Sequence, residues 1–191
     1  MEPARLAATE LACRRGDRVL FSGLSFALGP GEALQVSGPN GVGKSSLIRI
    51  LAGLLRPLAG RVERDGRLAL LDERPALDGD LPLASALAFW SRLDGGRPPL
   101  GYLGLDELLD VPVRYLSTGQ RKRAALARVA GQDAPMWLLD EPLNGLDREA
   151  IGLCEALVSE HCAAGGIAVI ASHQPFALPA LRALELGAAL A

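Results

Sequence analysis

Residues 38–46 read GPNGVGKSS, which fits the pattern G-x-x-x-x-G-K-[ST] of a phosphate-binding loop. The surrounding residues fit the motif as well, because residues 33–37 alternate like a strand and residues 46–55, SLIRILAGLL, have the apolar spacing of a helix. A glycine-rich turn without a ligand has no use for the GK[ST] ending in this context. The stretch therefore predicts an α/β fold in which a strand, a phosphate-binding loop and a helix follow one another.

Each part of this loop has a predicted role toward phosphate. Its glycines let the backbone fold into a nest of N–H donors, Lys44 places a positive charge at the β- and γ-phosphates, and Ser45 offers a hydroxyl to Mg²⁺. The predicted phosphate-binding residues are Gly38, Pro39, Asn40, Gly41, Val42, Gly43, Lys44, Ser45 and Ser46.

The composition suits one folded domain and excludes several classes of protein. A chain of 191 residues with 49% apolar residues can bury a substantial core. Its net charge of −2 gives no broad positive field, so we expect no nucleic-acid partner. No apolar run approaches the roughly 18 residues of a membrane span and the N-terminus is unlike a signal peptide, so we expect a cytoplasmic protein. Cys13, Cys154 and Cys162 lack CxxC spacing, which predicts reduced, mostly buried thiols.

The predicted elements change in character along the chain. Residues 6–12 and 19–28 alternate like strands, the helix after the loop should end near Arg56–Pro57, and Asp65–Gly66 predicts a hairpin between two short strands at 61–63 and 68–71. From about residue 75 to 135 we expect a helical insertion without clear strands. Beyond it we predict a strand at 136–139, a helix at 148–163 and a buried parallel strand at 167–171. The single domain, residues 1–191, is thus divided into a core at 1–74 and 136–191 and a helical part at 75–135.

The stretch MWLLDEP at 136–142 delivers two adjacent carboxylates at the end of a strand, where open α/β sheets bind ligands. We expect Asp140 to hold Mg²⁺, directly or through water. Neighbouring residues of a strand point to opposite sides, so Glu141 is free to poise a water in line with the γ-phosphate as a general base. Taken alone, the two acids would be read as a solvated exit from the strand, but the phosphate loop makes that the minority interpretation.

Two histidines receive different interpretations. Ser172–His173 ends the second buried strand, at the sheet edge where the phosphate loop should lie, so His173 is predicted to hydrogen-bond the γ-phosphate and sense hydrolysis. A lone histidine is more often structural, and only its position supports this role. His161 lies in a polar helix segment and is expected at the surface.

The turn LSTGQ at 116–120 runs into a helix that begins with the three cations Arg121, Lys122 and Arg123. Such a turn suits an anion, because unpaired N–H groups and the positive helix end point the same way. It belongs to the helical insertion, out of reach of the chain's own phosphate loop. A second copy of the chain, turned head to tail, would close that gap.

The motifs GPNGVGKSS, LSTGQ, LLDEP, NGLD at 144–147 and SH at 172–173 resemble, in the same order, the ATP-binding cassette of ABC transporters. The resemblance covers the whole chain and implies a P-loop NTPase (RecA-like) core with an antiparallel β subdomain and a helical insertion. It implies ATP as substrate with Mg²⁺, and a head-to-tail dimer in which Ser117 and Gly119, within a signature that also includes Gln120, cap the partner's γ-phosphate. Asp147 would link the two sites. The implied partners are multi-span membrane subunits, which would hold the chain peripherally at the cytoplasmic face of the inner membrane.

A narrower resemblance joins the chain to one group of cassettes. Residues 13–60 and the ending ASHQP at 171–175 are similar to the ATPase subunits of the haem exporters of cytochrome c maturation. This resemblance implies haem as the cargo, although the residues themselves include no CxxCH motif and no obvious axial ligand.

Three positions depart from the pattern of the family. Arg15 stands where most cassettes have an aromatic residue that stacks on adenine, and a guanidinium plane can stack in its place. Glu73 falls near the usual glutamine that contacts Mg²⁺; a carboxylate can ligate the ion, but a solvated loop acid is an equal alternative. Thr118 replaces the first glycine of the signature.

The leading functional hypothesis is the ATP-hydrolysing motor subunit of a transporter, either the haem exporter or another small ABC transporter. A soluble nucleotide switch of translation or DNA repair is the rival, but those proteins usually carry two cassettes or a long coiled coil, which 191 residues cannot hold. A degraded cassette that binds without hydrolysis is opposed by the presence of Lys44, Asp140, Glu141 and His173.

Overall fold

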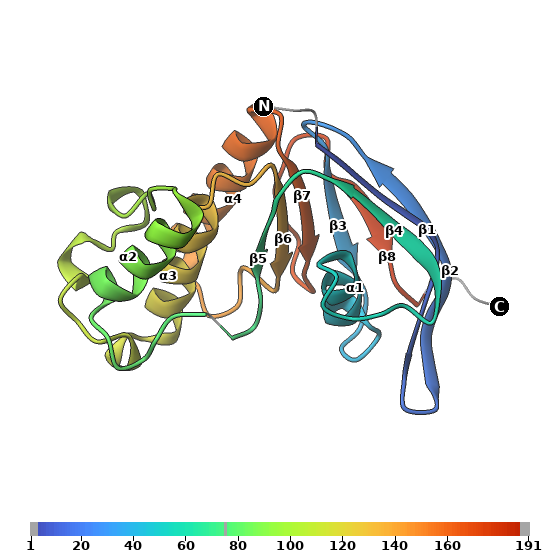
Figure 1. Ribbon diagram of the computed structural model, residues 1–191, viewed down its shortest axis with the longest axis horizontal. Helices are drawn as coiled ribbons and strands as arrows, with labels where there is room; N and C mark the ends of the chain where they lie inside the picture. The colour runs from blue at the N-terminus through green and yellow to red at the C-terminus, as the bar shows by residue number, and fades with distance from the viewer. Residues whose placement is uncertain (1–3, 75, 188–191) are drawn as a thin grey trace.

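The computed structural model describes residues 4–74 and 76–187, and its strands form two sheets (Figure 1). A three-stranded antiparallel sheet has the order β2-β1-β4, and a five-stranded parallel sheet has the order β5-β6-β7-β3-β8. The strands are β1 (Arg5–Arg15), β2 (Arg18–Leu28), β3 (Ala33–Ser37), β4 (Ala59–Asp65), β5 (Leu68–Leu71), β6 (Met136–Asp140), β7 (Ile167–Ala171) and β8 (Arg182–Glu185).

The helices lie on both sides of the parallel sheet. Figure 1 shows α1 between the two sheets, and α2, α3 and α4 on the opposite side of the parallel sheet. The helices are α1 (Lys44–Leu51), α2 (Leu83–Asp94), α3 (Thr118–Ala130) and α4 (Arg148–Ala163), and three 3-10 turns are η1 (Gly101–Leu103), η2 (Asp106–Leu108) and η3 (Val113–Tyr115).

Two cores meet back to back across the parallel sheet, because successive side chains of a strand point to opposite faces. On β6, Met136 and Leu138 join the core beside α1 and the antiparallel sheet, whereas Trp137 and Leu139 join the core beneath α3 and α4. A strand buried on both faces reads as a continuous apolar run, which is the pattern that predicted parallel strands here. The α/β prediction, with an antiparallel subdomain and a helical insertion, is confirmed.

The predicted hairpin around Asp65–Gly66 is wrong. β4 pairs with β1 in the antiparallel sheet, whereas β5 pairs with β6 in the parallel sheet, so the turn passes from one sheet to the other. The side chains explain the difference, since β4 is almost wholly exposed and charged, while the apolar β5 alternates between half-buried and buried positions. A turn signal is local and does not reveal which partner each flanking strand will find.

The helix after the phosphate loop ends earlier than predicted, at Leu51 rather than near Arg56–Pro57. Gly53 has a φ of 77°, and the N–H groups of Leu54 and Leu55 both donate to the Arg49 carbonyl, at 2.8 and 3.1 Å. This left-handed glycine closes the helix. Leu54 is consequently 66% exposed instead of lying on the buried face.

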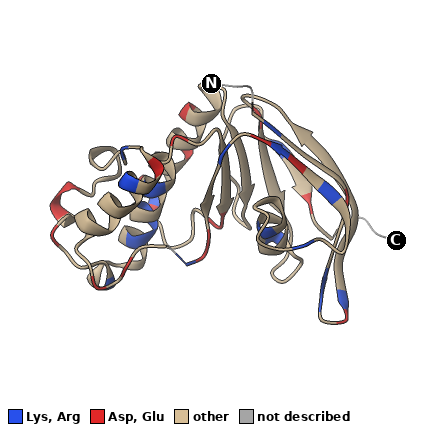
Figure 2. Ribbon diagram, in the orientation of Figure 1, with Lys and Arg blue, Asp and Glu red and all other residues tan. Residues whose placement is uncertain are grey.

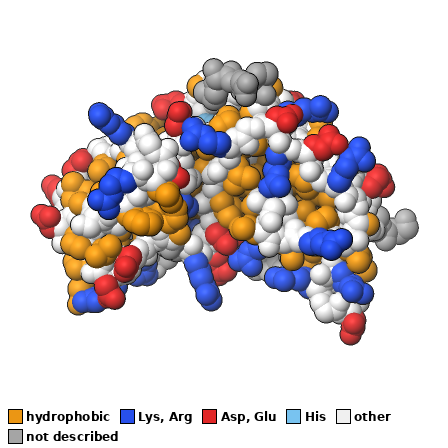
Figure 3. All heavy atoms as spheres, viewed as in Figure 1, with side chains coloured by type: hydrophobic (Ala, Val, Ile, Leu, Met, Phe, Trp, Pro, Cys, Tyr) orange, Lys and Arg blue, Asp and Glu red, His pale blue; other side chains and the backbone are white. Residues whose placement is uncertain are grey.

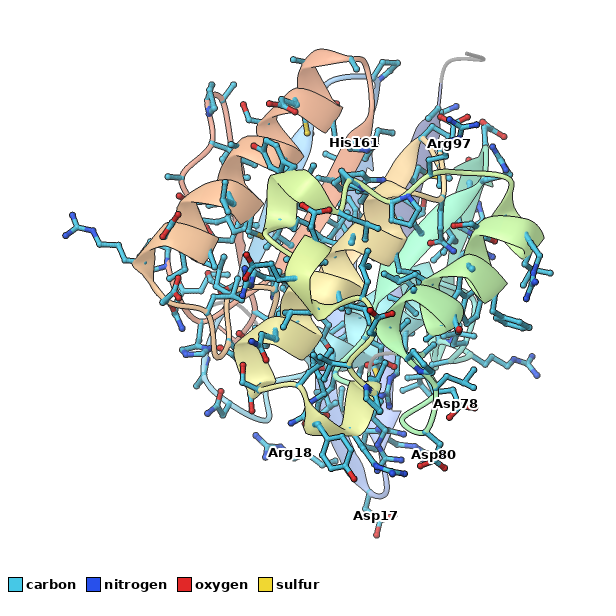
Figure 4. The ribbon with its side chains drawn as sticks, turned by 90° about the vertical axis from the view of Figure 1, so that its left-hand side faces the viewer. Asp17, Arg18, Asp78, Asp80, Arg97 and His161 are labelled. Atoms are coloured by element: carbon cyan, nitrogen blue, oxygen red, sulfur yellow. The ribbon has the colours of Figure 1, made fainter. Side chains whose placement is uncertain are left out.

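His161 is partly buried, whereas the prediction placed it at the surface. Its ring stacks on Trp137 with the centroids 3.9 Å apart, and Nε2 lies 3.3 Å from the Ile167 carbonyl oxygen. Burial lowers the pKa of His161, opposed by its contacts with backbone groups. Figure 4 shows His161 at the end of α4, beside the strands of the parallel sheet.

The cysteines behave as the sequence predicted. Cys13 and Cys154 are buried, Cys162 is partly buried, and all three are free thiols. Burial raises the pKa of Cys154 to about 12, which keeps its thiol protonated and inert.

Within residues 4–74 and 76–187, no group of three His, Cys, Asp or Glu residues is placed to hold a metal ion on its own. Of the helices described, none combines the length and the apolar character that a bilayer crossing requires.

Candidate nucleotide site

A cavity of about 720 Å³ lies at the carboxyl edge of the parallel sheet. Parallel α/β sheets bind ligands at this edge, where the loops after several strands converge. The residues that line it are Arg15, Leu20, Asn40, Gly41, Gly43, Lys44, Ser45, Ser46, Glu73, Thr118, Lys122, Asp140, Glu141, Asn144, Gly145 and His173. The cavity therefore brings together side chains from every motif that the sequence analysis singled out.

The phosphate loop needs glycine at its two ends for steric reasons. Gly38 has a φ of 133°, and a Cβ there would lie 2.6 Å from the Leu186 carbonyl oxygen. Gly43 has a φ of 118°, and a Cβ there would lie 3.1 Å from the ring of Phe21. The loop thus packs against the residue that follows β8 on one side and against β2 on the other. It presents the free N–H groups of the α1 N-terminus to the cavity.

Lys44 occupies the first position of α1 and is only 6% exposed. Its Nζ donates to the carbonyl oxygens of Gly38 and Pro39, at 2.8 and 3.4 Å. Gly38, Pro39 and the buried Val42 do not line the cavity themselves. They shape the loop and hold the lysine that does.

Asp140 is the last residue of β6 and is 3% exposed. Its Oδ1 is buried without a hydrogen-bond partner among the described residues. Burial raises the pKa of this carboxyl, and the nearby Ser45 hydroxyl opposes that rise. A buried carboxylate oxygen with an open coordination position, beside a hydroxyl, is the donor set that Mg²⁺ takes when phosphate oxygens and water complete its shell.

Glu141 faces the same cavity as Asp140, rather than the opposite side of the strand as predicted. β6 ends at Asp140, and Glu141 has a φ of 46°, so the alternation of the strand no longer applies to it. Its Oε2 lies 2.8 Å from His173 Nδ1 and its Oε1 lies 3.8 Å from Lys44 Nζ. A carboxylate only accepts, so Nδ1 carries the proton in this contact. Lys44, Glu141 and His173, which the sequence predicted to act at the γ-phosphate, therefore meet at the Glu141 carboxylate.

The signature turn at the start of α3 is capped by its own side chains. Ser117 Oγ accepts from the backbone N–H of Gln120 at 3.2 Å, and Gln120 Oε1 accepts from the N–H of Ser117 at 2.8 Å. This is a capping box, and it leaves the hydroxyl hydrogen of the exposed Ser117 free to donate. Ser117, Gly119 and Gln120 do not line the cavity, whereas Thr118 does, so the turn lies nearer to the chain's own site than predicted.

The segment NGLD packs directly against the signature turn. A Cβ at Gly119 would lie 2.8 Å from the carbonyl oxygen of Gly145, and a Cβ at Gly145 would lie 2.9 Å from the methyl group of Thr118. Asp147 ends this segment as the N-cap of α4, where its Oδ1 accepts from the N–H of Ala150 at 2.9 Å. Asp147 is exposed, outside the cavity.

The three cations that follow the signature all donate to backbone carbonyls. Arg121 reaches the carbonyl of Arg114 at 3.4 Å, Lys122 that of Glu141 at 3.0 Å, and Arg123 that of Leu103 at 2.8 Å. No role for these three side chains was predicted from the sequence. Cations are unfavourable in the first turns of a helix, so three in succession signal partners in the tertiary structure.

Arg15 and Glu73 both line the cavity and both are exposed. Arg15 ends β1 at the turn into β2, and Figure 4 shows Asp17 and Arg18 at the tip of this turn, away from the body of the protein. None of the described lining residues is Phe, Tyr or Trp. The backbone N–H of Glu73 donates to Asp72 Oδ1 at 2.7 Å.

Charges of both signs are mixed over the surface. Figure 2 shows Lys and Arg alternating with Asp and Glu along the antiparallel sheet and the helices, and Figure 3 shows no broad basic area on the face that it displays. That face lacks the continuous positive stripe on which non-specific nucleic-acid binding depends.

Comparison with known proteins gives matches along most of the chain. A model of the family described as ABC transporter matches residues 21–89 and 97–144. The chain is similar to "Cytochrome c biogenesis ATP-binding export protein CcmA" of Novosphingobium aromaticivorans, with 62% identity over 186 residues that cover 97% of each chain. The protein of the same name from Sphingopyxis alaskensis is 54% identical over 187 residues, which cover 95% of this chain and 96% of that one.

Solved structures match the fold at lower identity. An ATP-binding subunit of an ABC transporter superposes with a TM-score of 0.79 at 23% identity, covering 88% of this chain and 79% of that chain. An ATP-binding cassette of an ABC transporter in its ADP conformation superposes with a TM-score of 0.73 at 21% identity, covering 90% of this chain and 82% of that chain. At these identities the likeness shows the fold alone, and it confirms the predicted P-loop NTPase architecture.

Proposed function

The chain belongs to the ABC transporter family, and from this premise we propose that it is the ATP-hydrolysing subunit of an export complex for cytochrome c biogenesis. The curated relatives that it resembles over nearly their whole length carry the name CcmA. Haem, which the sequence resemblance implies, is the proposed cargo. The observation that carries the proposal is the meeting of Lys44, Glu141 and His173 in one cavity at the carboxyl edge of the sheet.

Different residues of the cavity bind the phosphates, accept the proton of the attacking water and hold the metal ion. The loop N–H groups and Lys44 hold the phosphates of ATP, and Glu141 accepts a proton from water as the water oxygen bonds to the γ-phosphorus. The bond to the β-phosphate oxygen breaks, which leaves ADP and inorganic phosphate. His173 keeps the Glu141 carboxylate turned toward the site through its Nδ1–H. Ser45 and Asp140 would hold Mg²⁺, which neutralises developing negative charge when bound.

The proposed working unit is a head-to-tail dimer attached to membrane subunits. Ser117, Gly119 and Gln120 would cap the γ-phosphate held by the partner copy, and Asp147 would connect the two sites. The exposed Ser117, whose hydroxyl hydrogen is unused by its cap, supports this assignment. Residues 75–135 would form the subdomain that meets multi-span membrane partners, at the cytoplasmic face of the inner membrane.

The base subsite and one metal contact are also proposals. Arg15 would stack its guanidinium plane on the base, because it lines the cavity and no aromatic ring from the described lining residues is available there. Glu73 would complete the surroundings of Mg²⁺, because it lines the same cavity as Asp140.

Complementation tests the proposed function directly. In a bacterium that lacks its own CcmA, the parent chain should restore covalent haem staining of c-type cytochromes, and Lys44→Ala and Glu141→Gln should not. The tagged protein should also sediment with membranes only when its multi-span partner is co-expressed. Normal ATP hydrolysis in vitro without restored cytochromes would contradict the proposed pathway while leaving the ATPase in place. If the amount of protein that sediments with membranes does not depend on co-expression of the partner, a soluble nucleotide switch would be favoured instead.

A further inference from the structure

Lys122 is a cation inside the nucleotide site that the predicted mechanism does not use. It lies half-buried in α3, lines the cavity and donates from Nζ to the backbone carbonyl of Glu141 at 3.0 Å. Among the described residues it forms no ion pair. A lysine withdrawn from water normally requires a specific compensation. Here its hydrogen-bond acceptor among the described residues is the Glu141 carbonyl oxygen, and the carboxylates of Glu73, Asp140 and Glu141 line the same cavity.

The residue that accepts this bond has a strained backbone. Glu141 has a φ of 46°, a conformation that is unfavourable for a residue with a side chain and persists only where the surroundings hold it. The N–H of Glu141 donates to the carbonyl of Ala171 at 2.8 Å, which ties it to β7. On the carbonyl side, the acceptor is shared between Lys122 at 3.0 Å and the N–H of Asn144 at 3.3 Å. The Glu141 backbone is therefore held on both sides, at its N–H by Ala171 and at its carbonyl by Lys122 and Asn144, and Lys122 is the one charged group among these contacts. We call these contacts the Glu141 backbone clamp.

We propose that Lys122 is a positioning residue for hydrolysis, which holds the backbone of Glu141 so that its carboxylate stays between Lys44 and His173. This inference rests on the proposed role of Glu141 as the general base. Lys122 acts through the Glu141 main chain and does not itself exchange a proton with the reacting water.

The position of Lys122 in the fold gives the clamp a second consequence. α3 begins at Thr118, directly after Ser117, and Lys122 follows one turn later on the same rigid helix. A movement of the signature turn toward a second copy's nucleotide would shift the Lys122 ammonium group and, with it, the Glu141 carbonyl. α3 thus links the turn proposed to bind the partner's ATP to Glu141, the base proposed to take a proton from the water that attacks the chain's own ATP.

Steady-state ATPase kinetics of the full-length protein separate this role from simple packing. Lys122→Met should lower kcat by about tenfold to a hundredfold, because a general base displaced by about 1 Å loses that much rate, while KM for ATP changes less than about twofold. Lys122→Arg keeps the donor and the charge and should recover most of kcat. Arg123→Met is the matched control, since Arg123 makes an equivalent bond to the Leu103 carbonyl on the same helix, away from Glu141.

A double-mutant cycle with Glu141→Gln provides the decisive readout, because two residues that act as one unit are not additive. In single-turnover measurements, Lys122→Met should cost less than about twofold once Glu141 is Gln. If the melting curve shows that the Lys122→Met variant does not fold, the same measurements are made on Lys122→Gln. An equal loss in both backgrounds, a rise in KM without a fall in kcat, or an unchanged kcat would each overturn the inference. Parent activity would remain in all three cases, so the proposed ATPase function would stand.

Discussion

Glu141→Gln is the substitution that isolates the proposed chemistry, because it removes the base and changes almost no volume. Glu141 is 21% exposed and contacts Lys44 Nζ at 3.8 Å and His173 Nδ1 at 2.8 Å. General-base catalysis contributes about 10² to 10⁴ in rate, so kcat should fall at least about a hundredfold, equivalent to about 2.7 kcal/mol. ATP binding should survive, since Lys44 and the loop N–H groups are untouched.

Glu141→Gln should also tighten ATP binding, and the strength of the contact between Glu141 and Lys44 limits how much. Two charges 3.8 Å apart attract by about 4 kcal/mol at an effective dielectric constant of about 20, but desolvation leaves such partly exposed pairs worth about 1 kcal/mol or less. The γ-phosphate must compete with Glu141 for Lys44, and the carboxylate also repels it. Removing the charge should therefore lower the Kd for ATP by up to about fivefold.

Three measurements check this prediction together. Phosphate release gives kcat, calorimetric titration with MgATP gives Kd, and light scattering after size exclusion reports whether ATP now holds two copies together. Glu160→Gln, an exposed carboxylate on α4, is the control for loss of one negative charge. A kcat for Glu141→Gln within twofold of the parent, or weaker ATP binding, would refute the assignment of Glu141 as general base.

Further predictions concern three other residues. Asp140→Asn should stabilise the metal-free protein at neutral pH, because the buried ionised carboxylate, whose Oδ1 has no partner among the described residues, is unfavourable there. A gain of about 1 kcal/mol in the free energy of unfolding corresponds to a rise in Tm of about 2–4 °C, measured by scanning fluorimetry. The same substitution should abolish Mg²⁺-dependent hydrolysis. Burial lowers the pKa of His161, so its stabilising contribution is complete above its ordinary pKa of about 6.5 and is lost as the pH falls below it. His161→Phe should keep the stacking on Trp137 and flatten the decline in Tm between pH 7 and 5; an unchanged slope would exclude His161 as its source. Arg15→Ala should weaken ATP and GTP binding by a similar factor of about five or more, and binding equal to the parent's would dismiss a stacking role.

The parts of the site that the sequence predicted are those fixed by local chemistry. The phosphate loop could be predicted because its backbone needs Gly38 and Gly43, which are close together in the chain. The acids at the end of β6 could be predicted because they directly follow a short strand that is buried on both faces. The contact of His173 with Glu141 joins residues 32 positions apart, and only the pairing of β6 with β7 brings their ends together. Strand order is a long-range property, so the sequence predicts the edge on which both residues lie but not the hydrogen bond between them.

Elements without a local pattern were missed. β8 consists of Arg182–Glu185, RALE, with an arginine and a glutamate at its ends and no alternation long enough to read. It becomes a strand because β3 offers it a parallel partner, through register pairs such as Leu34 with Arg182. Lys122 was missed for a related reason, since a lysine on a polar helix face looks solvated until the fold places the Glu141 carbonyl beneath it.

The charges of the cavity bear on why a second copy should be required. The described lining residues include the cations Arg15, Lys44 and Lys122 and the carboxylates Glu73, Asp140 and Glu141, so a single chain offers a triphosphate no net positive field. Lys44 and Lys122 are also partly neutralised by backbone carbonyls. Attraction for ATP then relies on Mg²⁺ held at Asp140 and on the loop N–H groups, and a further helix N-terminus aimed at the γ-phosphate would add to it. In the proposed dimer the α3 N-terminus of the partner supplies that last contribution, and ADP, which lacks the γ-phosphate, would not benefit from it.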